Sequence, residues 1–126
     1  MPKVRRTSAR LDLEMEQGTT FYLSMTWKSG ADEDDLTAVD LTDCTAEMQI
    51  RRSAGSSTIY DTYSTDNYIT LGGLAGTVVI EVPASVTEGY EWTHGEYDLE
   101  ITAADGTVRK LVRGDVTVFK EVTRDD

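Results

Sequence analysis

Several residue types are scarce in this chain of 126 residues, and each scarcity removes a class of function. A single cysteine, Cys44, excludes an internal disulfide and a cysteine-based zinc site. A single histidine, His94, leaves at most one imidazole for acid–base chemistry. No apolar run approaches the roughly 20 residues that a membrane-spanning helix requires, so we expect no membrane partner. The fold must therefore hold by packing alone, as expected for assembly in a reducing cytoplasm.

Basic residues are few and unevenly placed. The first ten positions contain no acid and hold four of the 12 basic residues, Lys3, Arg5, Arg6 and Arg10. The rest of the chain carries 8 basic and 23 acidic residues, a formal charge of −15. A body of that sign repels phosphate backbones, so we expect no nucleic-acid binding by the folded domain. The basic start also lacks the apolar stretch of a secretory signal.

The uneven charge divides the chain into a basic N-terminal arm, residues 1–8, and one domain, residues 9–124. The arm is either a solvated tail or a segment that docks on an acidic neighbouring subunit. In the second case, the partner-binding residues are the four basic ones, Lys3, Arg5, Arg6 and Arg10.

Alternating hydrophobicity is the dominant pattern in the domain. Tyr97, Leu99 and Ile101 alternate with polar residues, and Asp105-Gly106 then supplies a hairpin turn. Similar alternation over residues 11–16 and 21–27, split by a short glycine turn, predicts two adjacent strands with one common buried face. The alternation also predicts a set of buried core residues: Leu23, Met48, Ile50, Ile80, Leu99 and Ile101.

Helix signals are nearly absent. Pro83 should end the β-branched strand over residues 76–82, because proline has no N–H to donate to the ladder. One short helical stretch is predicted within residues 83–92, with Ser85 as its N-cap and Glu88 completing a capping box. About seven to nine short strands and at most one helical turn indicate an all-β, antiparallel sandwich or barrel.

Candidate catalytic and metal-binding residues are isolated. His94 is flanked by Thr93 and Gly95 and has no nucleophile motif around it, so a structural or surface role is favoured. Cys44 precedes a strand and is interpreted as a small buried residue rather than a reactive thiolate. The acidic run 32–35 suggests calcium, but it lacks the alternating spacing of a calcium loop. We therefore predict no catalytic residue, no metal site and no cofactor.

Three further features have a functional and a structural interpretation. The tripeptide Arg113-Gly114-Asp115 matches an integrin-binding motif, but its place between apolar segments favours a bulge or bend at Gly114. Tyr97, following Gly95, suggests a tyrosine corner, in which a buried hydroxyl bonds to upstream backbone. Six aromatic residues either line a sugar-binding platform or pack in the core and rim of a sandwich, the interpretation that we favour: Trp27, Tyr60, Tyr63, Tyr68, Tyr90 and Trp92.

Five segments together carry a resemblance to a known family: LDLEMEQGTTFYLSMTWK, DLTDCTAEMQIRRS, YITLGGLAGTVVIEVPAS, HGEYDLEITAADGTVRKLVRGDVTV and EVTR. The chain resembles small tailed-bacteriophage virion proteins, which look like the immunoglobulin-like N-terminal domain of phage baseplate upper proteins. The similarity covers residues 9–124. Its most specific parts are the opening L-x-L-x-x-x-x-G-x-T-F and the pair YDLEIT…DG with L-x-x-G-x-V-x-V.

The resemblance implies an immunoglobulin-like β-sandwich that is built into a virion and has no catalytic residues. The expected function is a non-enzymatic structural subunit of the tail, neck or baseplate, made in the host bacterial cytoplasm. Its expected partners are other virion proteins and neighbouring copies of itself in a symmetric ring. The alternative is a virion module that binds carbohydrate or the host surface through exposed aromatic residues.

Overall fold

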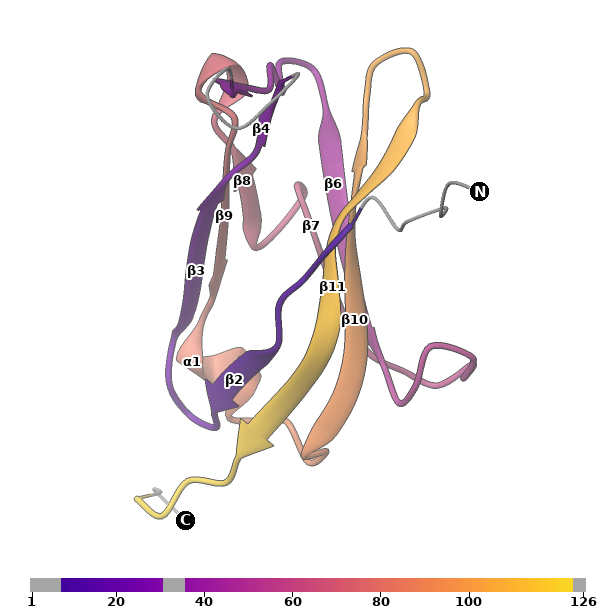
Figure 1. The fold of residues 1–126 in the computed structure, drawn as a ribbon. Coiled ribbons are helices and arrows are strands. Elements are labelled where there is room, and N and C mark those ends of the chain that lie inside the picture. The colour runs from indigo at the N-terminus through magenta and orange to yellow at the C-terminus, as the bar shows by residue number, and fades with distance from the viewer. Residues whose placement is uncertain (1–7, 31–35, 124–126) are drawn as a thin grey trace.

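Strands contain just over half of the residues that the computed structural model describes, 8–30 and 36–123 (Figure 1). They form two sheets that face each other, with one small hairpin beside them. This arrangement confirms the prediction of an all-β sandwich.

The larger sheet has the strand order β1-β11-β10-β6-β7, and β2 also pairs with β11. Its strands are β1 (Ala9–Arg10), β2 (Leu13–Glu16), β6 (Thr45–Arg51), β7 (Ile59–Ser64), β10 (His94–Thr102) and β11 (Val108–Phe119). Both β1 and β2 run parallel to β11, whereas the other pairs are antiparallel. The sheet is therefore mixed, and the prediction of a purely antiparallel sandwich was wrong at this edge.

The smaller sheet has the order β3-β9-β8, with antiparallel pairing throughout. Its strands are β3 (Phe21–Thr26), β9 (Thr77–Val82) and β8 (Ile69–Leu71). A 3-10 turn, η2 (Gly73–Ala75), joins β8 to β9, and a separate hairpin pairs β4 (Lys28–Ser29) with β5 (Thr37–Ala38). The long central strand of this sheet is β9, which leaves β3 and β8 as its two edges.

The strands β2 and β3 face the same core but lie in opposite sheets, so the prediction that they are adjacent strands was wrong. The turn between them crosses from one sheet to the other and is fixed by contacts to α1 (Ala84–Thr87) and the residues after it, about 70 positions later in the chain. The amide of Gln17 donates from Nε2 to the carbonyl oxygen of Tyr90 (2.8 Å), and the Gly18 N–H donates to Thr87 Oγ1 (3.1 Å). The local alternation of apolar and polar residues cannot predict hydrogen bonds between residues so far apart in the sequence.

The core lies between the two sheets and is made of inward-facing residues from both. The period-two pattern correctly identified five of the six predicted core residues, Met48, Ile50, Ile80, Leu99 and Ile101, which are all buried. Leu23 is only partly buried, because it lies on β3 at the edge of the smaller sheet. The inner face of β3 is therefore incompletely covered.

The β10–β11 hairpin is the longest in the domain and follows the prediction closely. Gly106 adopts a φ of 93° in the turn, a conformation that glycine accepts without strain. One register shift lies between Leu99 and Glu100. No shift lies at Gly114, which pairs in regular register with Tyr97, so of the predicted bulge or bend at Gly114 the bulge was wrong.

One short helix, α1 (Ala84–Thr87), follows β9 directly. Pro83 ends the strand as predicted, but Pro83 itself is the N-cap and no side chain caps the helix, so the capping box at Ser85 was wrong. Within the described residues, no helix is long and apolar enough to cross a membrane.

Candidate functional site at the N-terminal strand

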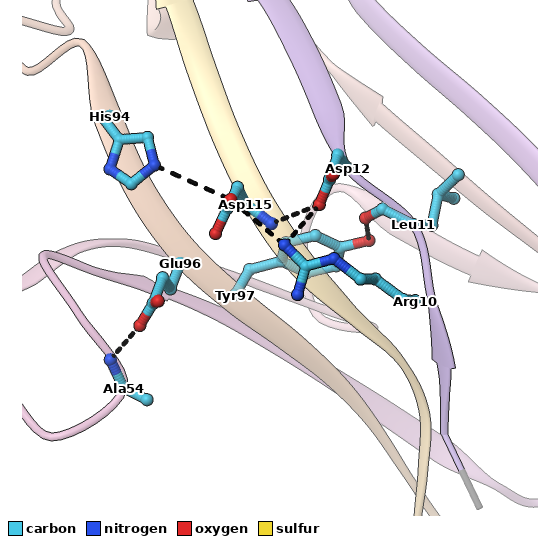
Figure 2. A network of polar contacts seen from close by, with 8 residues as sticks. All are labelled: Arg10, Leu11, Asp12, Ala54, His94, Glu96, Tyr97 and Asp115. Atoms are coloured by element: carbon cyan, nitrogen blue, oxygen red, sulfur yellow. Dashed lines mark hydrogen bonds and ion pairs between the residues drawn. The ribbon is translucent and has the colours of Figure 1, made fainter. Parts of the chain in front are cut away.

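The N-terminal strand runs along the edge of the larger sheet in two pieces, β1 and β2, which both pair with β11. Between them, Leu11 and Asp12 pass over Gly114 of β11. Figure 2 shows Leu11 and Asp12 beside Asp115 of β11. A Cβ atom at Gly114 would lie 2.3 Å from the Leu11 carbonyl oxygen and 2.9 Å from Asp12 Oδ1. Glycine is therefore required here for close approach of two backbones, which explains the glycine inside a strand.

Three hydrogen bonds fasten this crossing. The Leu11 N–H donates to the Arg113 carbonyl oxygen (2.8 Å), and the Tyr97 hydroxyl donates to the Leu11 carbonyl oxygen (2.5 Å). The Asp115 N–H donates to Asp12 Oδ1 (3.0 Å). Both backbone groups of Leu11 are thus satisfied by the larger sheet, and the strand continues across the point where its pairing changes.

Tyr97 makes the predicted hydrogen bond from its hydroxyl to an upstream backbone group. The acceptor, however, does not lie at a corner between two strands. The acceptor belongs to Leu11 on the N-terminal strand, and the bond crosses β11 to reach it. Burial raises the pKa of Tyr97 above its ordinary value, and the nearby Asp12 carboxylate adds to the rise. The hydroxyl therefore remains a hydrogen-bond donor well above neutral pH.

Of the predicted partner-binding residues, the structure places Arg10 in this network, whereas Lys3, Arg5 and Arg6 lie outside the described residues. Arg10 Nη2 lies 3.0 Å from Asp12 Oδ1 and 3.1 Å from Asp115 Oδ2. Its guanidinium is thus paired within its own chain, although half of the side chain remains exposed. Exposed ion pairs of this kind contribute about 0–1 kcal/mol each, so Arg10 aligns the strand more than it stabilises the fold.

The outer face of the larger sheet beside this crossing is charged and slightly concave. A shallow hollow of about 420 Å³ lies over β6, β10 and β11, and its lining carries charges of both signs. Lys110 Nζ lies 2.8 Å from Asp98 Oδ2 and 2.7 Å from Glu100 Oε1. Partial burial by itself lowers the pKa of Lys110, but the hydrogen bonds to the two carboxylates outweigh burial and raise it. The ammonium therefore remains charged at neutral pH.

Of the four cations that line the hollow, Arg10 and Lys110 form ion pairs, whereas Arg51 and Arg113 have no ion-pair partner among the described residues. The Arg51 guanidinium instead donates to the Ser56 carbonyl oxygen (2.8 Å) and to Gln49 Oε1 (2.9 Å). Arg113 has no such hydrogen bond at its buried Nε atom. The face thus combines ion pairs formed within the chain with two arginines that form none among the described residues.

The isolated reactive side chains stay isolated in the fold. His94 begins β10, and its Nε2 lies 4.0 Å from Asp115 Oδ2. Cys44 precedes β6, whose Thr45 pairs with Thr102 at the other end of β10. Because β10 spans nine residues, the imidazole and the thiol are separated by about 25–30 Å. No group of three or more possible metal ligands occurs within residues 8–30 and 36–123; the acidic run 32–35 lies outside them.

The aromatic side chains gather mainly inside the sandwich. Tyr63 and Tyr90 are buried, and their hydroxyl oxygens lie 2.5 Å apart. The Tyr90 hydroxyl also donates to Asp61 Oδ2 (2.5 Å). Trp92 stacks on Tyr60 with ring centroids 4.9 Å apart. The remaining two members of the predicted set, Trp27 and Tyr68, are partly buried against the core. These rings fill the interior and its rim and form no exposed platform.

The sequence indicated the crossing only indirectly. The residues of the crossing that local reasoning missed are Leu11, Asp12 and the backbone of Asp115, which meet only because a parallel strand joins the sheet edge. The available signal was the glycine within a strand, which marks either a bulge or a close backbone approach.

In comparisons with known proteins, no family model matches the chain, and no curated protein matches it either.

Proposed function

We propose that the chain is a non-enzymatic structural subunit of a tailed-phage virion, an adaptor or decoration domain of the tail, neck or baseplate. The observation that carries this proposal is the crossing of the N-terminal strand. The motifs that carry the family resemblance include Leu11 at the start of the opening motif, Tyr97 in YDLEIT and Gly114 in L-x-x-G-x-V-x-V. These three residues form the crossing. Residues from all three motifs thus meet in one structural feature, the crossing of the N-terminal strand over β11.

The sheet order supports the finer assignment to an immunoglobulin-like sandwich. The order β11-β10-β6-β7 against β3-β9-β8 corresponds to strands G, F, C and C′ against B, E and D of an immunoglobulin domain. The inter-sheet disulfide of antibody domains has no counterpart, because the chain has one cysteine. Leu99 occupies the centre of β10 instead and is buried among apolar residues.

The charge distribution supports assembly through other proteins. We propose that the basic arm, with Lys3, Arg5 and Arg6, docks on the acidic body of a neighbouring copy or another virion protein in a symmetric ring. Arg10 fixes the strand from which the arm departs. Modest contacts of this kind become firm when a ring repeats them. The protein would be made in the host bacterial cytoplasm and reside in the virion.

The alternative of a carbohydrate- or host-surface-binding module requires exposed aromatic residues. Of the six rings in the predicted set, two are buried and the others are partly buried. The observations therefore favour the structural subunit over this alternative.

The test is deletion of the gene from the phage that encodes the chain, followed by complementation with variants. Loss of complete particles in electron micrographs is expected for the deletion. Complementation with His94→Ala or Cys44→Ser should restore particle yield and infectivity to the wild-type level, because neither residue is needed for assembly. A variant that folds and enters particles but abolishes infectivity would refute the structural role and indicate an active site.

A further inference from the structure

The edge strand β3 has backbone groups that face away from its own sheet. The Trp27 N–H donates to the Gly76 carbonyl oxygen (2.8 Å), on the side of β9. Because backbone groups alternate along a strand, the odd-numbered residues of β3 bond to β9 and the even-numbered residues face outward. The outward-facing N–H and C=O groups belong to Tyr22, Ser24 and Thr26, and no strand among the described residues pairs with β3 on that side.

The other sheet edges carry features that discourage strand addition, and β3 carries none. The edge strand β8 has only three residues. The edge strand β7 has a register shift and an inward-pointing charge, Asp61. The β1–β2 edge carries Glu14 and Glu16 and is interrupted at Leu11–Asp12. The sequence of β3, FYLSMT, contains no charge and no proline, and its pairing with β9 has no bulge.

The side chains beside this edge are also incompletely covered. Phe21, Leu23 and Met25 face the core but are only partly buried, and Tyr22 on the outer face is 60% exposed. A strand added at β3 would cover the apolar side chains further, in addition to pairing the free backbone groups. Figure 1 shows β3 at the outer edge of the smaller sheet.

We propose that β3 binds β3 of a second copy, in an antiparallel pair about a two-fold axis at Ser24. In this register Ser24 lies opposite its symmetry mate and Tyr22 opposite Thr26, so polar side chains meet polar side chains on the outer face. On the inner face, Leu23 lies opposite Met25. No charge faces a like charge in the pair, and the strand is complementary to itself, as a two-fold interface requires.

The pair should be weak and should strengthen with salt. Its contact is one short strand per copy, well below the area of a stable dimer. Each copy carries a formal charge of −11, so the two copies repel at low ionic strength, and salt screens that repulsion. The inference concerns the purified chain and does not depend on a role in a virion.

Sedimentation velocity of the full chain tests the proposal, over a micromolar-to-millimolar concentration series at low and high salt. A dimer that grows with both variables is expected. Ser24→Pro removes the outward N–H at the axis, and with it two symmetric hydrogen bonds, so the dissociation constant should rise about tenfold or more. Ser24→Lys places two lysines opposite each other and should weaken the dimer several-fold. The matched control, Thr70→Lys, adds the same charge on the other edge strand, β8, and should leave the dimer unchanged.

Cross-linking gives a second measurement, because a covalent link accumulates even when the dimer is weak. In a Cys44→Ser background, Ser24→Cys should form a disulfide-linked dimer on mild oxidation, whereas Thr70→Cys should not. Thermal melts check that each variant folds. A chain that stays monomeric at millimolar concentration in high salt would overturn the proposal. So would a dimer that Ser24→Lys and Thr70→Lys weaken equally, or cross-links that form equally at both positions.

Discussion

Replacing Gly114 with alanine should loosen the N-terminal strand from the larger sheet. The new Cβ atom would lie 2.3 Å from the Leu11 carbonyl oxygen, whereas ordinary contact begins near 3.4 Å. The Leu11 backbone must therefore retreat by about 1 Å. A retreat of that size lengthens the hydrogen bond from the Tyr97 hydroxyl, now 2.5 Å, beyond the usual range.

Two routes give the same magnitude for this substitution. Forcing one extra methyl group into a packed site costs about 1–3 kcal/mol. Alternatively, the crossing opens and loses its three hydrogen bonds, each with a net contribution of about 1 kcal/mol. The free energy of unfolding should therefore fall by about 1–3 kcal/mol. For a domain of this size, that corresponds to a fall in Tm of roughly 3–15 °C.

Urea denaturation with and without the substitution measures the change, and hydrogen exchange locates it. Amide protection should fall at Leu11 and along β2 (Leu13–Glu16), while β6 keeps its protection. The matched control is Gly55→Ala, because no atom lies within 4 Å of a Cβ there, and its unfolding free energy should change by less than about 0.5 kcal/mol. Equal stability of Gly114→Ala and the wild type would refute the close-approach account of this glycine.

Three further predictions concern the core, the buried tyrosines and the arm. Leu99→Ala should lower the unfolding free energy by about 2–5 kcal/mol in urea denaturation, since the side chain is fully buried; a loss below about 0.5 kcal/mol would contradict the assigned phase of β10. Burial raises the pKa of Tyr63, Tyr90 and Tyr97, so the stability that they contribute is complete below pH 10 and is lost as the pH rises further. The unfolding free energy measured by denaturation should accordingly fall above pH 10, by up to about 1.4 kcal/mol per pH unit for each such tyrosine, and Tyr97→Phe should flatten the slope; a flat profile would contradict the burial of these hydroxyls. Deleting residues 1–8 should leave Tm nearly unchanged but reduce incorporation into particles, and equal incorporation of the truncated chain would contradict docking by the arm.

Local pattern was sufficient where a structural feature depends on neighbouring residues. The alternation of Leu99 and Ile101 with acidic residues identified the buried face of β10, because side chains of a strand alternate whatever its partner. Pro83 marked the end of β9, since its missing N–H acts at its own position. The Asp105-Gly106 turn followed from the conformational freedom of Gly106.

Features that depend on distant parts of the chain could not be predicted in this way. The parallel pairing of β1 and β2 with β11 joins residues about 100 positions apart, and no alternation pattern encodes it. The exposure of Leu23 follows from the place of β3 at a sheet edge, which only the strand order reveals. At Gly114, the signal was present, but it does not distinguish a bulge from a close approach until Leu11 is placed beside it.

The most direct test of the proposed function is a cryo-electron microscopy reconstruction of the intact particle produced by the phage that encodes the chain. The account predicts a two-layer sandwich of this strand order, repeated by symmetry in the tail, neck or baseplate, with the basic arm against an acidic neighbour. Fully infectious particles that lack this chain would contradict it.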